Sequence, residues 1–185
     1  MQRRTFLTIP LIASALITDG QRTNKANPKK GFKVEKGRGR NVEQMKVLGS
    51  TFDCKVSGKD TNGQLCIFDT TREGQTSPPL HLHHNQDEWF YVIKGEFKVQ
   101  VGDEVLILRE GDSAFAPRKI PHTFAKTSEG VGQMMIIFQP AGKMEEFFIE
   151  RVNLESEKDP LKKEAALKTL WDRHGMKVVN EPKKV

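Results

Sequence analysis

The chain of 185 residues carries 30 Lys and Arg against 24 Asp and Glu, a formal net charge of +6, and 36% of its residues are hydrophobic. This length suits one domain with appendages. The chain has no uninterrupted apolar run of about 18 residues, which excludes a polytopic membrane protein. Its two cysteines exclude a disulfide-rich miniprotein and a four-cysteine zinc ribbon.

Residues 1–20 are predicted to be an export signal. Arg3 and Arg4 precede a short apolar stretch from Phe6 to Ile17, followed by small residues, which is the order found in secretory signal peptides. The run Arg3-Arg4-Thr5-Phe6-Leu7 resembles the twin-arginine signal of bacteria; an ordinary signal peptide or an uncleaved anchor is the alternative. The resemblance implies export of the folded chain to the periplasm, with no stable membrane span after the signal is cleaved.

Most of the positive charge lies in residues 21–40, which have a net charge of +7, whereas residues 41–185 have a net charge of −2. A nucleic-acid-binding domain is expected to carry basic residues on its folded face. The basic segment is instead rich in Gly, Asn and Pro. Residues 21–41 are therefore predicted to be a basic flexible linker, and no nucleic-acid partner is expected. A tether that also touches an anionic surface is the alternative.

Residues 42–142 are predicted to form an all-β barrel or sandwich, because short apolar segments alternate with turn residues. The predicted strands, in chain order, are 52–56, 65–68, 81–88, 89–93, 97–101, 105–108, 114–116, 123–125 and 134–138. Residues 57–63 are a predicted hairpin loop. Cys54 and Cys66 are symmetric about residue 60, so they are expected either to form a disulfide across the hairpin or to be two buried thiols.

Residues 143–185 are predicted to be a helical extension. Apolar residues recur at helical spacing from Met144 to Val152. Asp159 followed by Pro160 predicts the start of a second helix, and His174 followed by Gly175 predicts its end. We expect the two helices to cover part of the outside of the barrel, with His174 as a helix cap or a surface residue.

Two strings in the β region resemble the two signature motifs of the cupin superfamily. The first runs from His81 through His83 and Glu88 to Gly95, and it matches at every fixed position. The second runs from Gly111 through Pro117 to His122. The resemblance covers roughly 100 residues on this motif spacing, and it implies a double-stranded β-helix, which is a small jelly-roll barrel.

The second string departs from the family pattern at two positions. Lys119 stands where a glycine is usual, and Lys126 stands where an asparagine is usual. Proline and histidine are both kept in this string, so His122 stays a predicted ligand. The expected difference is in the geometry of the turn before it.

The four polar residues of these strings are predicted to bind one metal ion. Residues i and i+2 of a strand point to the same face, so His81 and His83 project together while His84 does not. Glu88 follows a predicted turn, and His122 comes from the second string. Three imidazoles and one carboxylate suit a divalent transition metal (Fe, Mn, Co, Ni, Cu or Zn) rather than Mg or Ca. An octahedral ion held this way keeps two positions open for water, dioxygen or substrate.

Three apolar residues are predicted to line a substrate pocket beside the metal. Phe90 and Val92 share a strand face with Glu88, and Phe124 shares a face with His122. An aromatic lining favours an apolar or aromatic substrate. The alternative is that these residues simply fill the core of the barrel.

The strings PPLHLHHNQDEWFYVIKGE and WDRHGMKVV are similar to those of bacterial quercetin-dioxygenase-like, single-domain cupins. This resemblance implies a dioxygenase acting on a small phenolic or enol substrate, with Glu88 doubling as the catalytic base, and a homodimer joined through sheet edges. Fold does not fix function, so two alternatives stay open. One is a metal-dependent isomerase or decarboxylase of a small acid or sugar, and the other is a non-enzymatic cupin that binds a small ligand.

Overall fold

The computed structural model describes residues 30–40 and 43–179. The predicted export signal, residues 1–20, lies outside the described residues, and so do residues 21–29 and 41 of the predicted linker. Residues 30–40 contact the barrel. The ammonium group of Lys55 donates hydrogen bonds to the carbonyls of Glu35 and Arg38, at 3.1 and 3.0 Å. This part of the predicted linker is therefore tied to the edge of the fold.

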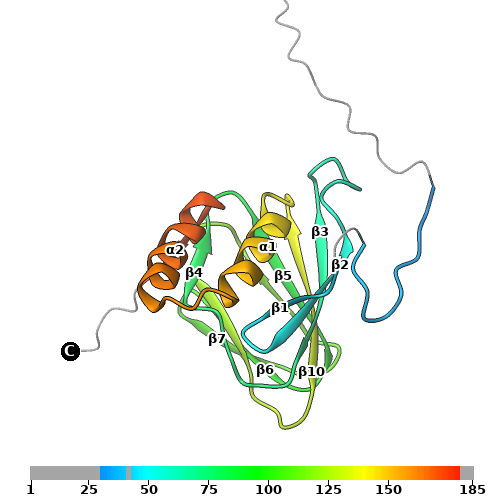
Figure 1. Cartoon of the computed structure of the whole chain (residues 1–185). Coiled ribbons are helices and arrows are strands. Elements are labelled where there is room, and N and C mark those ends of the chain that lie inside the picture. The colour runs from blue at the N-terminus through cyan, green and yellow to red at the C-terminus, as the bar shows by residue number, and fades with distance from the viewer. Residues whose placement is uncertain (1–29, 41–42, 180–185) are drawn as a thin grey trace, which may run out of the picture.

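Two antiparallel sheets face each other and form a jelly-roll barrel (Figure 1). The six-stranded sheet has the order β1 (Met45–Val47), β2 (Ser50–Val56), β3 (Cys66–Arg72), β10 (Gly132–Gln139), β5 (Asp87–Lys94), β8 (Ser113–Ala116). The five-stranded sheet has the order β11 (Met176–Val178), β4 (His81–His83), β9 (His122–Lys126), β6 (Phe97–Val101), β7 (Glu104–Leu108). The predicted all-β jelly-roll class is confirmed.

The core lies between the sheets because the strands alternate buried and less buried residues. Along β3 and β10 every second residue is buried, the pattern of a strand with one face toward the interior. Phe68, Phe90, Phe97 and Phe138 are among the largest fully buried side chains. Burial of such side chains stabilises a fold by about 1.5–3 kcal/mol each, so this layer holds the two sheets together.

The predicted hairpin between β2 and β3 is confirmed, but its cysteines do not face each other. Cys54 lies opposite Phe68, and the pairing of the two strands ends at Val56 and Ile67, before Cys66 is reached. Both cysteines are free and buried. Burial raises the pKa of both thiols above the ordinary value. Of the two expectations for these residues, the structure shows the buried thiols.

Two helices, α1 (Met144–Glu155) and α2 (Pro160–Arg173), lie side by side against the barrel (Figure 1). As predicted, the side chain of Asp159 caps α2 by accepting hydrogen bonds from the backbone N–H groups of Leu161 and Lys162. His174 is the C-cap of α2 and is buried, with its Nδ1 donating to the Leu170 carbonyl at 2.8 Å. The cap expectation is confirmed and the surface alternative is wrong, because the ring packs against Phe147 of α1.

After α2 the chain returns to the barrel as a strand, which the sequence analysis does not predict. β11 pairs antiparallel with β4, with Met176 opposite His83 and Val178 opposite His81.

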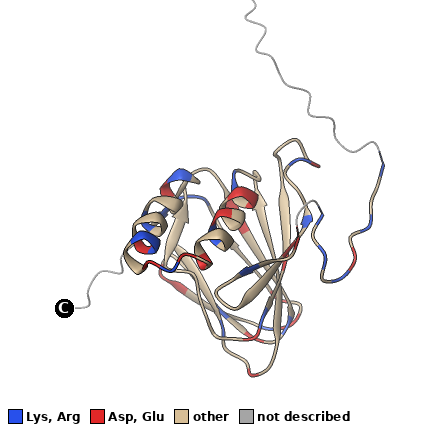
Figure 2. Cartoon of the chain, viewed as in Figure 1, with Lys and Arg blue, Asp and Glu red and all other residues tan. Residues whose placement is uncertain are grey.

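Figure 2 shows charged residues of both signs along α1 and α2, whereas the strands of the barrel carry few. Neither helix is both long and apolar enough to cross a membrane, within the described part of the chain.

Candidate metal centre

Four buried side chains from three strands converge inside the barrel. His81 and His83 come from β4, Glu88 from β5 and His122 from β9. Each offers one ligand atom, and these four atoms lie within 4.8 Å of one another. The pairing of β4 with β9 places His81 directly opposite His122, and the facing sheet supplies Glu88. The structure thus brings together all four residues named from the sequence, while His84 is exposed.

Backbone and amide oxygens fix the orientation of the three imidazoles. Nδ1 of His81 donates to the Pro79 carbonyl at 2.9 Å, and Nδ1 of His122 donates to the Ile120 carbonyl at 2.9 Å. Nδ1 of His83 lies 3.4 Å from Oε1 of Gln86. Such outer contacts are typical of metal-binding histidines, because they set the tautomer and aim Nε2 at the ion.

Gln86 is a supporting residue that the sequence analysis missed. Its side-chain amide donates to the Ala141 carbonyl at 2.9 Å, which turns Oε1 toward His83. Gly142 allows this arrangement, because any side chain there would collide with the Gln86 amide. In the sequence, the position of Gln86 three residues after His83 indicates this supporting role.

The carboxylate of Glu88 lies where an ion bound by the histidines would need it. Its Oε2 is 2.9 Å from Nε2 of His122 and 3.1 Å from Nε2 of His83. Around an octahedral ion with bonds of about 2.1 Å, adjacent ligand atoms lie about 3.0 Å apart. Nε2 of His83 is buried and has no partner with hydrogen-bond geometry. The donor set, its spacing and this unsatisfied atom all fit a divalent transition metal.

The electrostatics of the four residues are those of a site prepared for a cation. Burial lowers the pKa of His81 to about 3, helped by the neighbouring charge of His122, so its imidazole is neutral and can act as a ligand. Burial alone would raise the pKa of Glu88, but the hydrogen bond from His122 and the charges of the nearby His122 and His83 rings outweigh it and hold the pKa below the ordinary value. Glu88 is therefore an anion surrounded by nitrogen donors.

The turn before His122 keeps its shape despite the lysine in it. Lys119 has a φ of 68°, in the left-handed region where glycine is usual. Its backbone N–H donates to the His83 carbonyl at 2.7 Å. The expected difference in turn geometry is thus the strained backbone of Lys119. Its hydrogen bond to His83 joins the two strings that carry the ligands.

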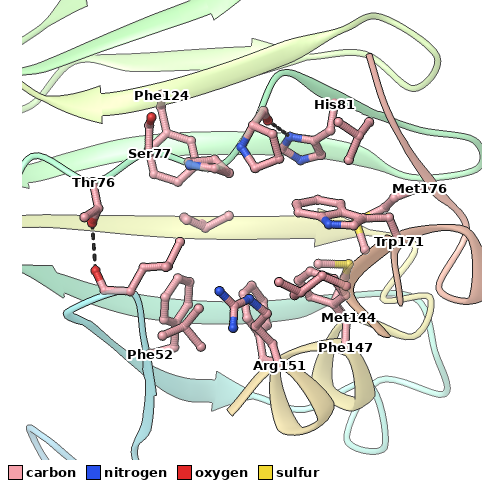
Figure 3. A pocket seen from close by; sticks show the side chains of 18 of the residues that line it. Phe52, Thr76, Ser77, His81, Phe124, Met144, Phe147, Arg151, Trp171 and Met176 are labelled. Atoms are coloured by element: carbon pink, nitrogen blue, oxygen red, sulfur yellow. Dashed lines mark hydrogen bonds between the residues drawn. The ribbon is translucent and has the colours of Figure 1, made fainter. Parts of the chain in front are cut away.

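The metal centre opens into a cavity of about 630 Å³ between the barrel and the helices. His81 and Glu88 belong to its wall, together with Phe52 and Phe124 of the barrel. Figure 3 shows Met144, Phe147, Arg151 and Trp171 facing these barrel residues from the helical side. The ring of Trp171 lies 4.9 Å from that of His81, measured between centroids. The helices therefore form a wall of the cavity, a role beyond covering the outside of the barrel.

The three residues predicted to line the pocket have different positions. Phe124 lines the cavity. Phe90 and Val92 face the interior, as their parity with Glu88 requires, but they are fully buried and are absent from the cavity wall. Phe90 packs behind the site, with its ring 6.2 Å from that of His122 and 5.2 Å from that of Phe124. The cavity opens on the helical side of the metal centre, away from these two side chains.

The part of the chain that carries these residues is similar in sequence to known proteins. Residues 68–138 match the family described as Cupin domain. An uncharacterized protein of Aquifex aeolicus is 30% identical over 100 residues, which are 54% of this chain and 73% of that protein. "Oxidoreductase iacF" of Pestalotiopsis fici is 44% identical over 54 residues, 29% of this chain and 26% of that protein, so the match spans about a quarter of the fungal relative.

Among solved structures, an RmlC-like cupin from Shewanella frigidimarina superposes with a TM-score of 0.51 at 21% identity. The superposition covers 63% of this chain and 96% of that one. Nearly the whole neighbour is thus matched by about two thirds of this chain. At this identity the likeness concerns the fold.

Proposed function

The chain belongs to the cupin superfamily, and from this premise we propose that it is a metal-dependent dioxygenase of a small phenolic or enol substrate. The observation that carries the proposal is the position of the four ligand residues. His81 and Glu88 lie in the wall of a cavity of about 630 Å³, so a small molecule can reach an ion held there. The local match to the fungal oxidoreductase supports an oxidative reaction.

The four residues would hold one divalent transition metal through Nε2 of His81, His83 and His122 and a carboxylate oxygen of Glu88. When bound, the metal supplies Lewis-acid and redox chemistry. Glu88, which lies in the cavity wall, is the residue we assign as the base that accepts the proton of the substrate hydroxyl. Phe124, Phe147 and Trp171 exclude water and stack on an aromatic substrate.

Oxygen uptake tests this proposal. Protein loaded separately with Fe, Mn, Co, Ni, Cu or Zn is mixed with a flavonol or a 1,3-diketone in an oxygen electrode. We expect uptake with one or more metals, lost in Glu88→Gln and His83→Ala and kept in His84→Ala, whose side chain is exposed. Turnover without oxygen uptake would show an isomerase or decarboxylase, and ligand binding without product would show a binding protein.

A non-oxidative enzyme acting on a small acid is the second candidate, favoured by one observation. Arg72, a buried cation, lies in the wall of the same cavity. An acid held there would lie in the same cavity as His81 and Glu88. Product formation under strict exclusion of oxygen, measured by NMR with 2-oxo acids and with oxalate, distinguishes this candidate from the dioxygenase.

We propose further that residues 1–20 direct export of the folded chain to the periplasm. Support comes from the run Arg3-Arg4-Thr5-Phe6-Leu7. Replacing both arginines by lysine keeps the charge but changes the twin-arginine pair. Cell fractionation should find the unchanged protein in the periplasm and the double variant in the cytoplasm; export of the double variant would contradict the proposal.

The apolar edge of the five-stranded sheet supports a homodimer. Val105 and Ile107 of β7 are 53% and 45% exposed, and Phe115 of the adjacent β8 is 56% exposed. An exposed apolar edge strand is a liability unless another chain covers it. Light scattering should give a dimer for the native chain and a monomer for Ile107→Lys. Leu161→Lys, at a still more exposed apolar residue on α2, should remain a dimer.

A further inference from the structure

Arg72 is a buried cation in the wall of the cavity. It ends β3, on the inward face that also carries Phe68 and Thr70, and it is 4% exposed. Its guanidinium carbon lies 4.5 Å from the ring centroid of Phe124 and 5.6 Å from that of Phe52, and both rings line the same cavity. The charge is therefore held between two aromatic faces at the site where a ligand would bind.

The hydrogen bonds of Arg72 leave part of the guanidinium unused. Nη1 donates to Oγ of Ser50 at 3.2 Å and lies 3.4 Å from the Thr76 carbonyl. Nε is buried without a partner. Among residues 30–40 and 43–179, none accepts a hydrogen bond from Nη2, and none places a carboxylate within 4.0 Å of the guanidinium. Burial lowers the pKa of Arg72 to about 10, which still leaves it charged at neutral pH.

Two other arginines show what Arg72 lacks. Arg118 donates through Nε and Nη2 to the two carboxylate oxygens of Asp87, at 3.0 and 2.6 Å. Arg151, which also lines the cavity, has a carboxylate oxygen of Glu155 2.6 Å from its Nη1, an ion pair that balances the charge although it lacks hydrogen-bond geometry. In Arg118, Nε and Nη2 bind a carboxylate. In Arg72, the same two nitrogens have no acceptor among the described residues. A buried charge without a hydrogen-bonded partner destabilises the fold unless a ligand supplies that partner.

We propose that Arg72 binds the carboxylate of a ligand in the cavity, so that the substrate is an aromatic carboxylic acid. This assignment rests on the proposed function for the metal end of the cavity and adds the recognition of the other end. Arg72 is a buried cation of the cavity wall without a carboxylate partner among the described residues, and it matches one negative charge on a ligand. The aromatic wall, with Phe52, Phe124 and Phe147, matches an apolar body rather than a sugar.

Matched pairs of ligands test the proposal without knowledge of the natural substrate. The probes are benzoate against benzamide and 2-naphthoate against 2-naphthamide, which differ in charge but hardly in shape. Binding is measured by calorimetry, to metal-free and to zinc-loaded protein. We expect at least about tenfold tighter binding of each carboxylate in both forms, because an ionised acceptor strengthens the hydrogen bonds of a buried arginine.

Three variants locate the preference. Arg72→Met should abolish it, and Arg72→Lys should reduce it, because an ammonium group cannot supply the paired donors. Arg151→Met should keep it, since that charge is already balanced by Glu155. Circular dichroism and thermal unfolding establish that each variant folds. If Arg72→Met does not fold, the decision falls to Arg72→Lys and to the native protein.

Several results would overturn the assignment: equal affinities within each ligand pair, no binding of either carboxylate at millimolar concentration, or a preference that survives in Arg72→Met or disappears in Arg151→Met. A preference seen only with zinc present would assign the carboxylate to the metal and would also overturn it. Elemental analysis reports metal binding separately. A chain that prefers carboxylates but binds no metal keeps this inference and rejects the proposed function.

Discussion

Two polar clusters, one between the barrel and α1 and the other along the cavity, differ in whether their donors and acceptors are satisfied. In the first, Glu145 of α1 accepts hydrogen bonds from Oγ of Ser57 at 2.8 Å and from the backbone N–H of Gly58 at 2.8 Å. In the second, which comprises the metal centre and Arg72 in the cavity wall, Nε2 of His83 and Nε of Arg72 have no hydrogen-bond partner. Natural structures rarely leave buried polar atoms unpaired. The first cluster is therefore satisfied within the fold, whereas the second has the unsatisfied atoms expected of a binding site.

The largest expected effect separates the two clusters directly. His83→Ala removes one ligand atom, and metal affinity should fall by more than about 100-fold, beyond the loss usual for outer residues. A competition titration with a coloured chelator and elemental analysis measure the loss. His84→Ala, which changes the exposed neighbour, is the matched control. Full metal content in His83→Ala would remove this residue from the site.

Glu145→Ala should do the opposite, lowering stability and leaving metal affinity unchanged. It deprives Ser57 and Gly58 of their shared acceptor, and a buried donor without a partner costs about 1–3 kcal/mol. Urea unfolding measures the free energy of unfolding. Glu146→Ala, the exposed neighbour on α1, should change it by less than about 0.5 kcal/mol. A loss of metal binding in Glu145→Ala would make the two clusters one coupled network.

The pH dependence of metal binding sharpens the comparison further. Burial disfavours the charged form of His122, but its hydrogen bond to Glu88 and the charge of that carboxylate raise its pKa above the ordinary value. The proton on Nε2 must leave before a metal binds there. Metal affinity is therefore full above this raised pKa and falls as the pH drops through it, by about tenfold per pH unit for one proton. Equal affinity between about pH 6 and pH 8 would contradict this.

The smallest effect concerns the turn that supports the site. Lys119→Gly should raise the free energy of unfolding by up to about 1 kcal/mol, because glycine adopts a φ of 68° without the clash of a Cβ atom. Metal affinity should be unchanged, since the backbone hydrogen bond to His83 remains. Lys119→Ala keeps the Cβ and should show no gain. A gain shared by both variants would trace the strain to the lysine side chain instead.

Strand parity and motif spacing were enough to predict the four ligand residues. Alternation puts His81 and His83 on one face, and the two strings supply Glu88 and His122 at separate points of the same barrel. The residues of the cavity wall were harder to predict from the sequence, because the wall depends on how α1 and α2 pack on the barrel. Trp171 falls within the predicted second helix, but its contact with His81 depends on how that helix packs on the barrel.

Arg72 and β11 escaped prediction for different reasons. The inward position of Arg72 follows from counting along β3 from Phe68, but its lack of a carboxylate partner depends on every neighbouring element. β11 has three residues, Met-Lys-Val, too few to show a period of two. The two cysteines would face each other only if the β2–β3 pairing were centred on residue 60. The pairing is centred one residue further along, so Cys54 lies opposite Phe68, and the loop sequence does not indicate this difference.

The pairing of β11 with β4 has a consequence for biosynthesis. The strand that bears His81 and His83 has β11 as one hydrogen-bonded neighbour, and those partners lie more than 90 positions further along the chain. A nascent polypeptide emerging from the ribosome cannot finish the ligand-bearing strand until residue 178 has been made and released. The β11 partner of the strand that bears His81 and His83 is therefore available only after α1 and α2 have been synthesised.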